Sequence, residues 1–111
     1  MIFKTINEYQ KTAMRTASQK CRHLGDVGLG LAGESGEVAD MIKKHLFQGH
    51  DLDREHMAKE LGDVAWYIAL GAELIGYDLE SILQMNIEKL LERYPDGFDP
   101  EKSIHRKEGD I

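Results

Sequence analysis

The sequence has a single cysteine and no long apolar run, and both features exclude some classes of protein. Cys21 is the only cysteine, so an internal disulfide and a cysteine-based zinc site are excluded, and the chain suits a reducing compartment. No stretch approaches the roughly 18 apolar residues that a membrane span needs. The first residues, Met-Ile-Phe-Lys-Thr, lack the apolar core of a signal peptide. We therefore expect a cytoplasmic protein without a membrane partner.

Basic residues are also scarce. The chain of 111 residues carries 14 Lys and Arg against 20 Asp and Glu, a net charge of −6. Binding to a nucleic acid polymer needs a basic surface, so DNA and RNA are not expected partners. A small phosphate compound is still compatible with this charge if a metal ion and a few local cations neutralise it. With 41% hydrophobic residues, we expect a single domain over residues 1–111, with a polar tail over about 99–111 that is extended or loosely packed.

The spacing of apolar residues predicts helices and no strand. Apolar positions recur at helical spacing in four segments, and helix-start or helix-stop residues such as Thr5, Asp53 and Gly76 bound them. The expected helices span approximately 6–24, 29–45, 54–75 and 79–90. The fold class is all-α, with a four-helix bundle-type protomer. Such thin helices leave part of each apolar stripe uncovered, so we expect an oligomer, either a homodimer or a homotetramer.

Two carboxylate pairs are the most informative feature of the sequence. Glu34 and Glu37 lie in the second expected helix, and Glu60 and Asp63 lie in the third. Acids three residues apart share one side of a helix, and at about 100° per residue both pairs flank the core-facing stripe. A single pair is usually a solvated acidic face. Two pairs in the same register predict four converging carboxylates, which repel one another unless a cation such as Mg²⁺ or Mn²⁺ lies between them.

The second helix is rich in glycine, and its first glycines match the dinucleotide-binding pattern GxGxxG over residues 28–33. That pattern needs a preceding strand and a βαβ unit, which this sequence does not offer. Each glycine inside a helix costs about 1 kcal/mol relative to alanine. We therefore predict that Gly30, Gly33 and Gly36 allow close packing or leave room beside the acids.

Several polar residues share a face with the acids or interrupt an apolar stripe. Lys44 lies on the face of Glu37, where it is able either to meet a phosphate or to pair with Asp40. Tyr67 lies on the face of Glu60, and its hydroxyl is suited to a ligand contact, whereas the neighbouring Trp66 is more typical of a core position.

The fourth expected helix carries an amide within its apolar stripe. Asn86 lies between apolar residues, and a buried amide must be hydrogen bonded. Lys89 and Arg93 follow on the same edge. They are consistent either with side chains that extend to solvent or with a polar strip directed at an anionic ligand, and we favour the strip. Gln10 similarly lies within the apolar stripe of the first helix.

Three segments together resemble the MazG-like nucleoside triphosphate pyrophosphohydrolases. They are Leu31-Ala-Gly-Glu34-Ser-Gly-Glu37-Val-Ala-Asp40, Glu60-Leu-Gly-Asp63-Val-Ala-Trp66-Tyr67 and Asn86-Ile-Glu-Lys89-Leu-Leu-Glu-Arg93-Tyr94-Pro95. The resemblance covers approximately residues 5–100. The family pattern often has two adjacent acids at its start, and Gly33 stands at the first of those positions, which leaves four acids.

The resemblance implies an oligomeric all-α enzyme that uses Mg²⁺ to cleave a nucleotide between its α and β phosphates, releasing a monophosphate and pyrophosphate. It implies that the metal ligands and catalytic residues are Glu34, Glu37, Glu60 and Asp63. It further implies that the substrate contacts are Lys44, Tyr67, Asn86, Lys89 and Arg93, and we also expect Gln10 to contact the substrate. A phosphoribosyl-ATP or dUTP-type hydrolase of the same superfamily, or a non-catalytic helical interaction module, is the alternative.

Overall fold

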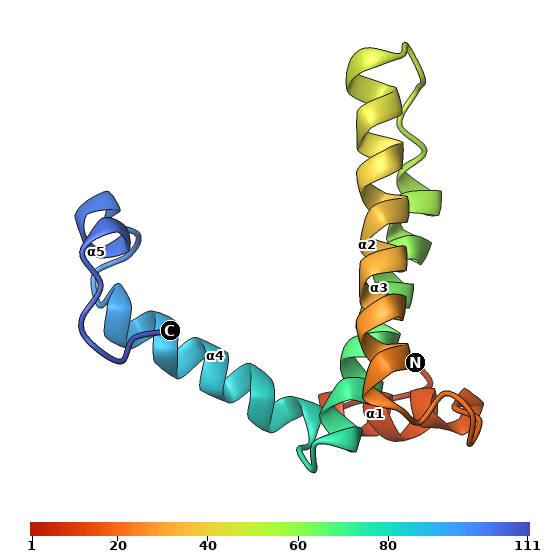
Figure 1. The fold of residues 1–111 in the computed structure, drawn as a ribbon, viewed down its shortest axis with the longest axis horizontal. Coiled ribbons are helices and arrows are strands. Elements are labelled where there is room, and N and C mark those ends of the chain that lie inside the picture. The colour runs from red at the N-terminus through yellow and green to blue at the C-terminus, as the bar shows by residue number, and fades with distance from the viewer. The chain divides into compact units, whose positions relative to one another are not determined.

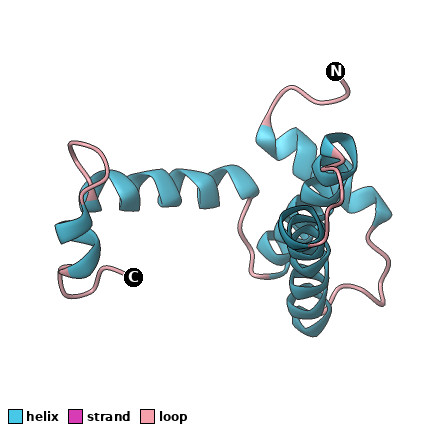
Figure 2. Cartoon of the chain, turned by 90° about the horizontal axis from the view of Figure 1, so that it is seen from above, coloured by secondary structure: helices cyan, strands magenta, loops and turns pink.

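The computed structural model describes residues 1–111, and all of its regular elements are helical (Figure 2). In chain order they are α1 (Ile6–Ala13), the 3₁₀ turn η1 (Met14–Thr16), α2 (Leu24–Phe47), α3 (Arg54–Leu74), α4 (Leu79–Arg93) and α5 (Pro100–Ile104). The predicted all-α fold class is confirmed. None of these helices is both long and apolar enough to cross a membrane.

The chain divides into two compact units, Met1–Leu79 and Glu80–Ile111, and each is described by itself. The first unit holds α1, α2 and α3, and the second holds all but the first residue of α4 together with α5. The expectation of one domain over residues 1–111 stays a prediction.

The helix-start and helix-stop residues act as the sequence predicts. The Thr5 hydroxyl accepts a hydrogen bond from the Glu8 amide at 3.1 Å, and the Asp53 carboxylate accepts one from the His56 amide at 3.0 Å. Both contacts satisfy amides that have no partner within the first turn. After α3, Gly76 has a φ of 82°, a left-handed conformation that glycine adopts without strain and that ends the helix.

Two predicted helix boundaries are wrong. The first helix ends at Ala13 instead of continuing to residue 24, because nearby side chains take up its last backbone groups: the Thr16 hydroxyl donates to the Ala13 carbonyl at 2.9 Å. The second helix begins at Leu24, five residues earlier than expected. Within the polar tail, Asp99 caps the short helix α5 through the Glu101 amide at 3.0 Å.

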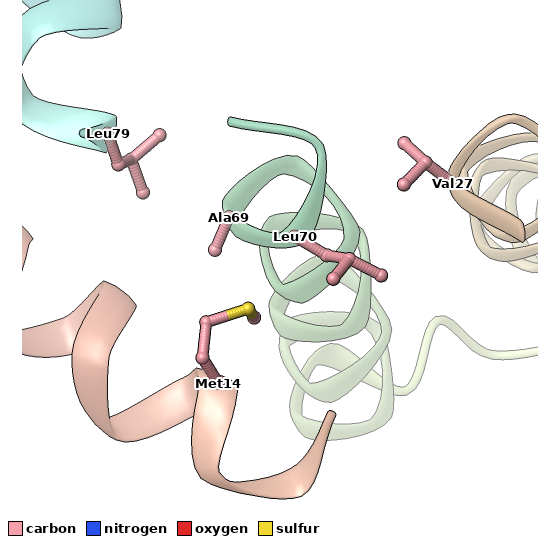
Figure 3. Close-up of a cluster of buried hydrophobic side chains, with 5 residues drawn as sticks. All are labelled: Met14, Val27, Ala69, Leu70 and Leu79. Carbon is pink, nitrogen blue, oxygen red and sulfur yellow. The ribbon is translucent and has the colours of Figure 1, made fainter. Parts of the chain in front are cut away.

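The core of the first unit lies where α1, α2 and α3 meet (Figure 3). The helices α2 and α3 run antiparallel and side by side, and α1 packs against α3 near one end of the pair (Figure 1). The buried cluster consists of Met14, Val27, Ala69, Leu70 and Leu79. This core is small, so much of the stability of the unit depends on few contacts.

Two side-chain contacts tie α3 to the segments that precede α2. The indole Nε1 of Trp66 donates to the Ala13 carbonyl at 3.0 Å and lies 2.9 Å from the Thr16 hydroxyl. The prediction that Trp66 packs with the core is confirmed. Arg22 also forms an ion pair with Glu73 of α3.

Many large apolar side chains are exposed in the isolated chain. Leu29 and Phe47 of α2 are 79% and 80% exposed, and on α4 Leu83, Ile87 and Leu91 are exposed as well. The expected uncovered stripes are therefore present. Whether a second copy of the chain covers them stays a prediction.

Candidate functional site

The close approach of Gly30 and Tyr67 sets the register of α2 against α3. A Cβ atom on Gly30 would lie 2.5 Å from Cδ1 of Tyr67 and closer still to two other ring atoms. Only a glycine therefore leaves room for this ring, as the sequence predicts for Gly30. No atom lies near the corresponding positions of Gly33 and Gly36, so those two glycines face open space and do not pack within the chain.

This register brings acids of the two helices together. Glu34 lies one turn beyond Gly30 on α2, and Asp63 lies one turn before Tyr67 on the antiparallel α3. Glu60 lies three residues before Asp63. One carboxylate oxygen from each of Glu34, Glu60 and Asp63 lies within 4.8 Å of the others. Three oxygen ligands at such distances are of the kind that Mg²⁺ and Mn²⁺ bind.

The pKa of Glu34 reflects the crowding of these acids. It is raised above its usual value of 4.5, first by loss of hydration and then by a hydrogen bond with Glu60. The negative charges of Asp63, Glu60 and Glu37 raise it further. Like charges disfavour ionisation. The carboxylates of the cluster therefore repel one another, and a bound cation would relieve that repulsion.

Glu37, the fourth predicted acid, lies outside this group of three. It is exposed, and its charge still acts on both Glu34 and Lys44. Lys44 itself pairs with Asp40 at 2.8 Å, which is the alternative that the sequence left open for it, and this contact raises the pKa of Lys44. Lys43 shares the same partner at 3.2 Å.

Two tyrosines border the acid cluster. The pKa of Tyr67 is raised by burial first and then by the charges of nearby acids, among them Asp26 and Glu34. The pKa of Tyr9, on α1, is raised by burial and by Asp63. Helical spacing does not single out Tyr9, since a contact between α1 and α3 is visible only once the helices are packed.

His56 is a further neighbour of the cluster, and the motifs of the sequence did not identify it. It is exposed, and its Nε2 atom lies 3.2 Å from a carboxylate oxygen of Glu60. The two residues are four apart on α3, so the spacing was available as a signal. This contact gives Glu60 a second polar neighbour besides Glu34.

Gln10 is buried and its amide is engaged by the backbone. Its Oε1 atom accepts a hydrogen bond from the Leu79 amide at 2.7 Å. Its Nε2 atom donates to the carbonyls of Ala69 and Tyr77 at 3.3 and 3.4 Å. These contacts give Gln10 a structural role in the first unit, and its contact with substrate stays a prediction.

The three predicted substrate residues of α4 lie in the second unit. Asn86 is exposed in the single chain, as are the neighbouring Leu83 and Ile87, so its burial depends on whether a second copy covers this stripe and stays a prediction. Lys89 is exposed as well. The Arg93 side chain is 8% exposed and forms an ion pair with Asp110 at 2.7 Å.

Comparison with known proteins gives two matches. A family model described as the MazG nucleotide pyrophosphohydrolase domain matches residues 24–98, a range that contains α2, α3 and α4. The chain is also similar to the Gene 37 protein of Mycobacterium phage L5, with 37% identity over 78 residues, 67% of this chain and 68% of that protein. No solved structure matches the chain.

Proposed function

Because the chain belongs to the MazG nucleotide pyrophosphohydrolase family, we propose that it is an enzyme that hydrolyses a nucleoside triphosphate between the α and β phosphates. The products would be a nucleoside monophosphate and pyrophosphate. The observation that carries this proposal is the cluster of Glu34, Glu60 and Asp63 on two helices of the matched region.

The chemistry of this cluster fits a divalent metal ion. Its ligands are carboxylate oxygens, which Mg²⁺ and Mn²⁺ prefer over softer donors. The raised pKa of Glu34 also indicates that no cation of the protein balances the charge of this carboxylate. When bound, such an ion would neutralise phosphate charge and lower the pKa of a water molecule.

The residues of the chain would then divide the work of phosphoryl transfer, which depends on charge neutralisation and on an oriented nucleophile. Glu34, Glu60 and Asp63 would hold the ion. Glu37 would complete the site from one turn along α2, either as a fourth ligand or as the group that accepts a proton from the attacking water. Tyr67 would border the reacting phosphates through its hydroxyl.

The remaining predicted substrate residues would bind the nucleotide. We assign Lys44, Lys89 and Arg93 to phosphate groups and Asn86 to the orientation of the nucleotide. Lys44 would leave Asp40, and Arg93 would leave Asp110, to bind phosphate oxygens. Both lysine and arginine bind carboxylate and phosphate groups. Gln10 would act on the site through the packing of α1.

Product analysis tests the reaction. The full chain is incubated with Mg²⁺ and a panel of canonical and modified nucleoside triphosphates, phosphoribosyl-ATP and dUTP, and the products are separated by chromatography. We expect monophosphate and pyrophosphate, and the preferred substrate of the panel decides among the related hydrolases. Diphosphate with orthophosphate as the main products would contradict the proposal.

Substitution of one acid ties this activity to the cluster. Asp63→Asn should lower turnover by about 100-fold or more, because a charged group is lost where transition-state charge develops. Glu55→Gln is the matched control, since Glu55 is an acid of the same helix whose side chain is 83% exposed. Full activity in Asp63→Asn would reject the mechanism, and no turnover with any nucleotide would favour a helical interaction module.

A further inference from the structure

The second unit contains a basic pocket, and only some of its lining residues belong to the region that the family model matches. The pocket has a volume of about 410 Å³. Its cationic side chains are Lys89, Arg93, Lys102, Arg106 and Lys107. The first two belong to α4, whereas the other three lie beyond residue 98, where the family match ends. The acidic side chains that line the pocket are fewer, namely Glu92, Glu108 and Asp110, so the pocket is positive in a chain whose net charge is −6.

The guanidinium of Arg93 is the buried centre of this pocket. Its side chain is 8% exposed, and it meets the Asp110 carboxylate with two parallel hydrogen bonds. Nε donates to Oδ2 at 2.9 Å, and Nη2 donates to Oδ1 at 2.7 Å. The same contact lowers the pKa of Asp110, and Lys89 and Arg106 lower it further. A buried cation needs such a partner, since an unpaired charge is strongly unfavourable away from water.

The backbone around Gly109 delivers Asp110 to this position. The ribbon returns to α4 after α5 (Figure 1), and the Asp110 amide donates to the Lys107 carbonyl at 3.1 Å to close a turn. Gly109 has a φ of 85° within that turn, a conformation that residues with side chains rarely adopt. The contact between Asp110 and Arg93 therefore depends on a specific turn and not on a chance approach of two flexible side chains.

A phosphate group offers Arg93 the same pair of oxygens that a carboxylate offers. We infer that Asp110 is an internal ligand of this pocket, which occupies Arg93 until a phosphate group replaces it, and that the segment after residue 98 supplies further phosphate contacts beside Lys89 and Arg93. Lys89, Lys102, Arg106 and Lys107 are exposed and take part in none of the ion pairs of the structure. They are therefore free to contact the other phosphate oxygens.

The segment after residue 98 would thus have two effects. Its cations would add phosphate contacts to those of α4, and Asp110 would compete with the phosphate group for Arg93. The inference rests on the proposed function, which assigns Lys89 and Arg93 to phosphate groups. Pyrophosphate and a nucleoside monophosphate are the two sources of that chemistry, since the proposed reaction releases both.

Binding without metal tests the site apart from the acid cluster. Pyrophosphate and a nucleoside monophosphate are titrated separately into the full chain with a chelator present, by calorimetry and by NMR of the Arg93 Nε–H signal. If Asp110 occupies Arg93 in about nine of ten molecules, Asp110→Asn should bind the ligand about tenfold more tightly, because the apparent affinity scales with the open fraction. Arg93→Gln should weaken binding by about tenfold or more, since it removes the forked donor.

The control is Glu101→Gln, which makes the same change in net charge on the same segment. Glu101 lies outside the pocket and its side chain is 77% exposed, so we expect its affinity to stay within about twofold of the parent value because exposed charges are screened by salt. The ligand that gains affinity in Asp110→Asn identifies the source of the phosphate.

Equal affinity in Asp110→Asn and the parent chain, or an Arg93 signal that ligand does not shift, would overturn the inference. Turnover with metal is measured on the same preparations. An active chain in which Asp110→Asn has no effect rejects this inference alone. An inactive chain in which Asp110→Asn binds more tightly rejects the proposed function and leaves the phosphate site in place.

Discussion

Replacing Gly30 by alanine should separate the packing of α2 on α3 from the helix propensity of α2. An alanine inside a helix is favoured over glycine by about 1 kcal/mol. At this position, however, the new methyl group would overlap the ring of Tyr67, and relieving such an overlap costs about 1–3 kcal/mol. The net expectation for Gly30→Ala is a change in the free energy of unfolding between zero and a loss of about 2 kcal/mol.

Gly28→Ala is the matched control on the same helix. No atom lies within 4 Å of the position that its Cβ would take, so only the propensity term applies, and the variant should gain about 1 kcal/mol. The two variants should therefore differ by about 1–3 kcal/mol, with Gly28→Ala the more stable. At roughly 4–8 °C per kcal/mol for a small domain, thermal melts resolve this difference.

The assay becomes specific in a Tyr67→Ala background. Without the ring there is nothing for the introduced methyl group to displace, so Gly30→Ala should then stabilise the chain as Gly28→Ala does. The coupling between the two positions should be about 1–3 kcal/mol, in the range of residues in direct contact. A Gly30→Ala variant as stable as Gly28→Ala in the parent background, or a coupling near zero, would refute the assigned register.

Three further predictions concern the acids and the exposed apolar surface. Mg²⁺ or Mn²⁺ at millimolar concentration should raise the melting temperature through binding to the folded state, and Glu34→Gln, Glu37→Gln and Glu60→Gln should reduce that rise in thermal melts while the helical circular dichroism stays intact. Without metal, stability should fall as the pH rises above 4.5, because the folded chain holds a proton on Glu34 in a range where the unfolded chain has released it. Asp40 and Asp110, whose pKa values are lowered, should reduce the stability of the fold only below pH 3.8. In a pH series of thermal melts, the loss of stability above pH 4.5 should therefore disappear when Glu34→Gln is the only substitution. Sedimentation should give a dimer or tetramer at micromolar concentration because of the exposed apolar residues on α2, α3 and α4, and a stable monomer would contradict that expectation.

The acid cluster was largely predictable because helical spacing alone places Glu60 and Asp63 on one side of α3. The partner from α2 was predictable only as one member of a pair. Which acid of that pair enters the cluster depends on the register of the two helices. That register is fixed by the fit of a tyrosine ring against a glycine, and no sequence pattern expresses such a fit.

Contacts between distant positions account for what the sequence did not predict. The end of α1 depends on Trp66, which is 53 residues away from Ala13, and local spacing favoured a longer helix. The ion pair of Arg93 joins residues 17 apart through a glycine turn, so reasoning from α4 alone left the guanidinium free for substrate. The exposure of Asn86 was not predicted either, because periodicity identifies an apolar stripe without showing what covers it.

Trp66 gives the molecule a natural fluorescent reporter. It is the only tryptophan of the chain, and its indole nitrogen is bonded to the carbonyl at the end of α1. Its ring also lies edge to face with Tyr67, with 5.0 Å between the ring centres. Emission from this one residue should therefore respond both to detachment of α1, which exposes the indole to water, and to a ligand that moves Tyr67. Emission recorded beside circular dichroism would distinguish a local opening at α1 from loss of the whole fold.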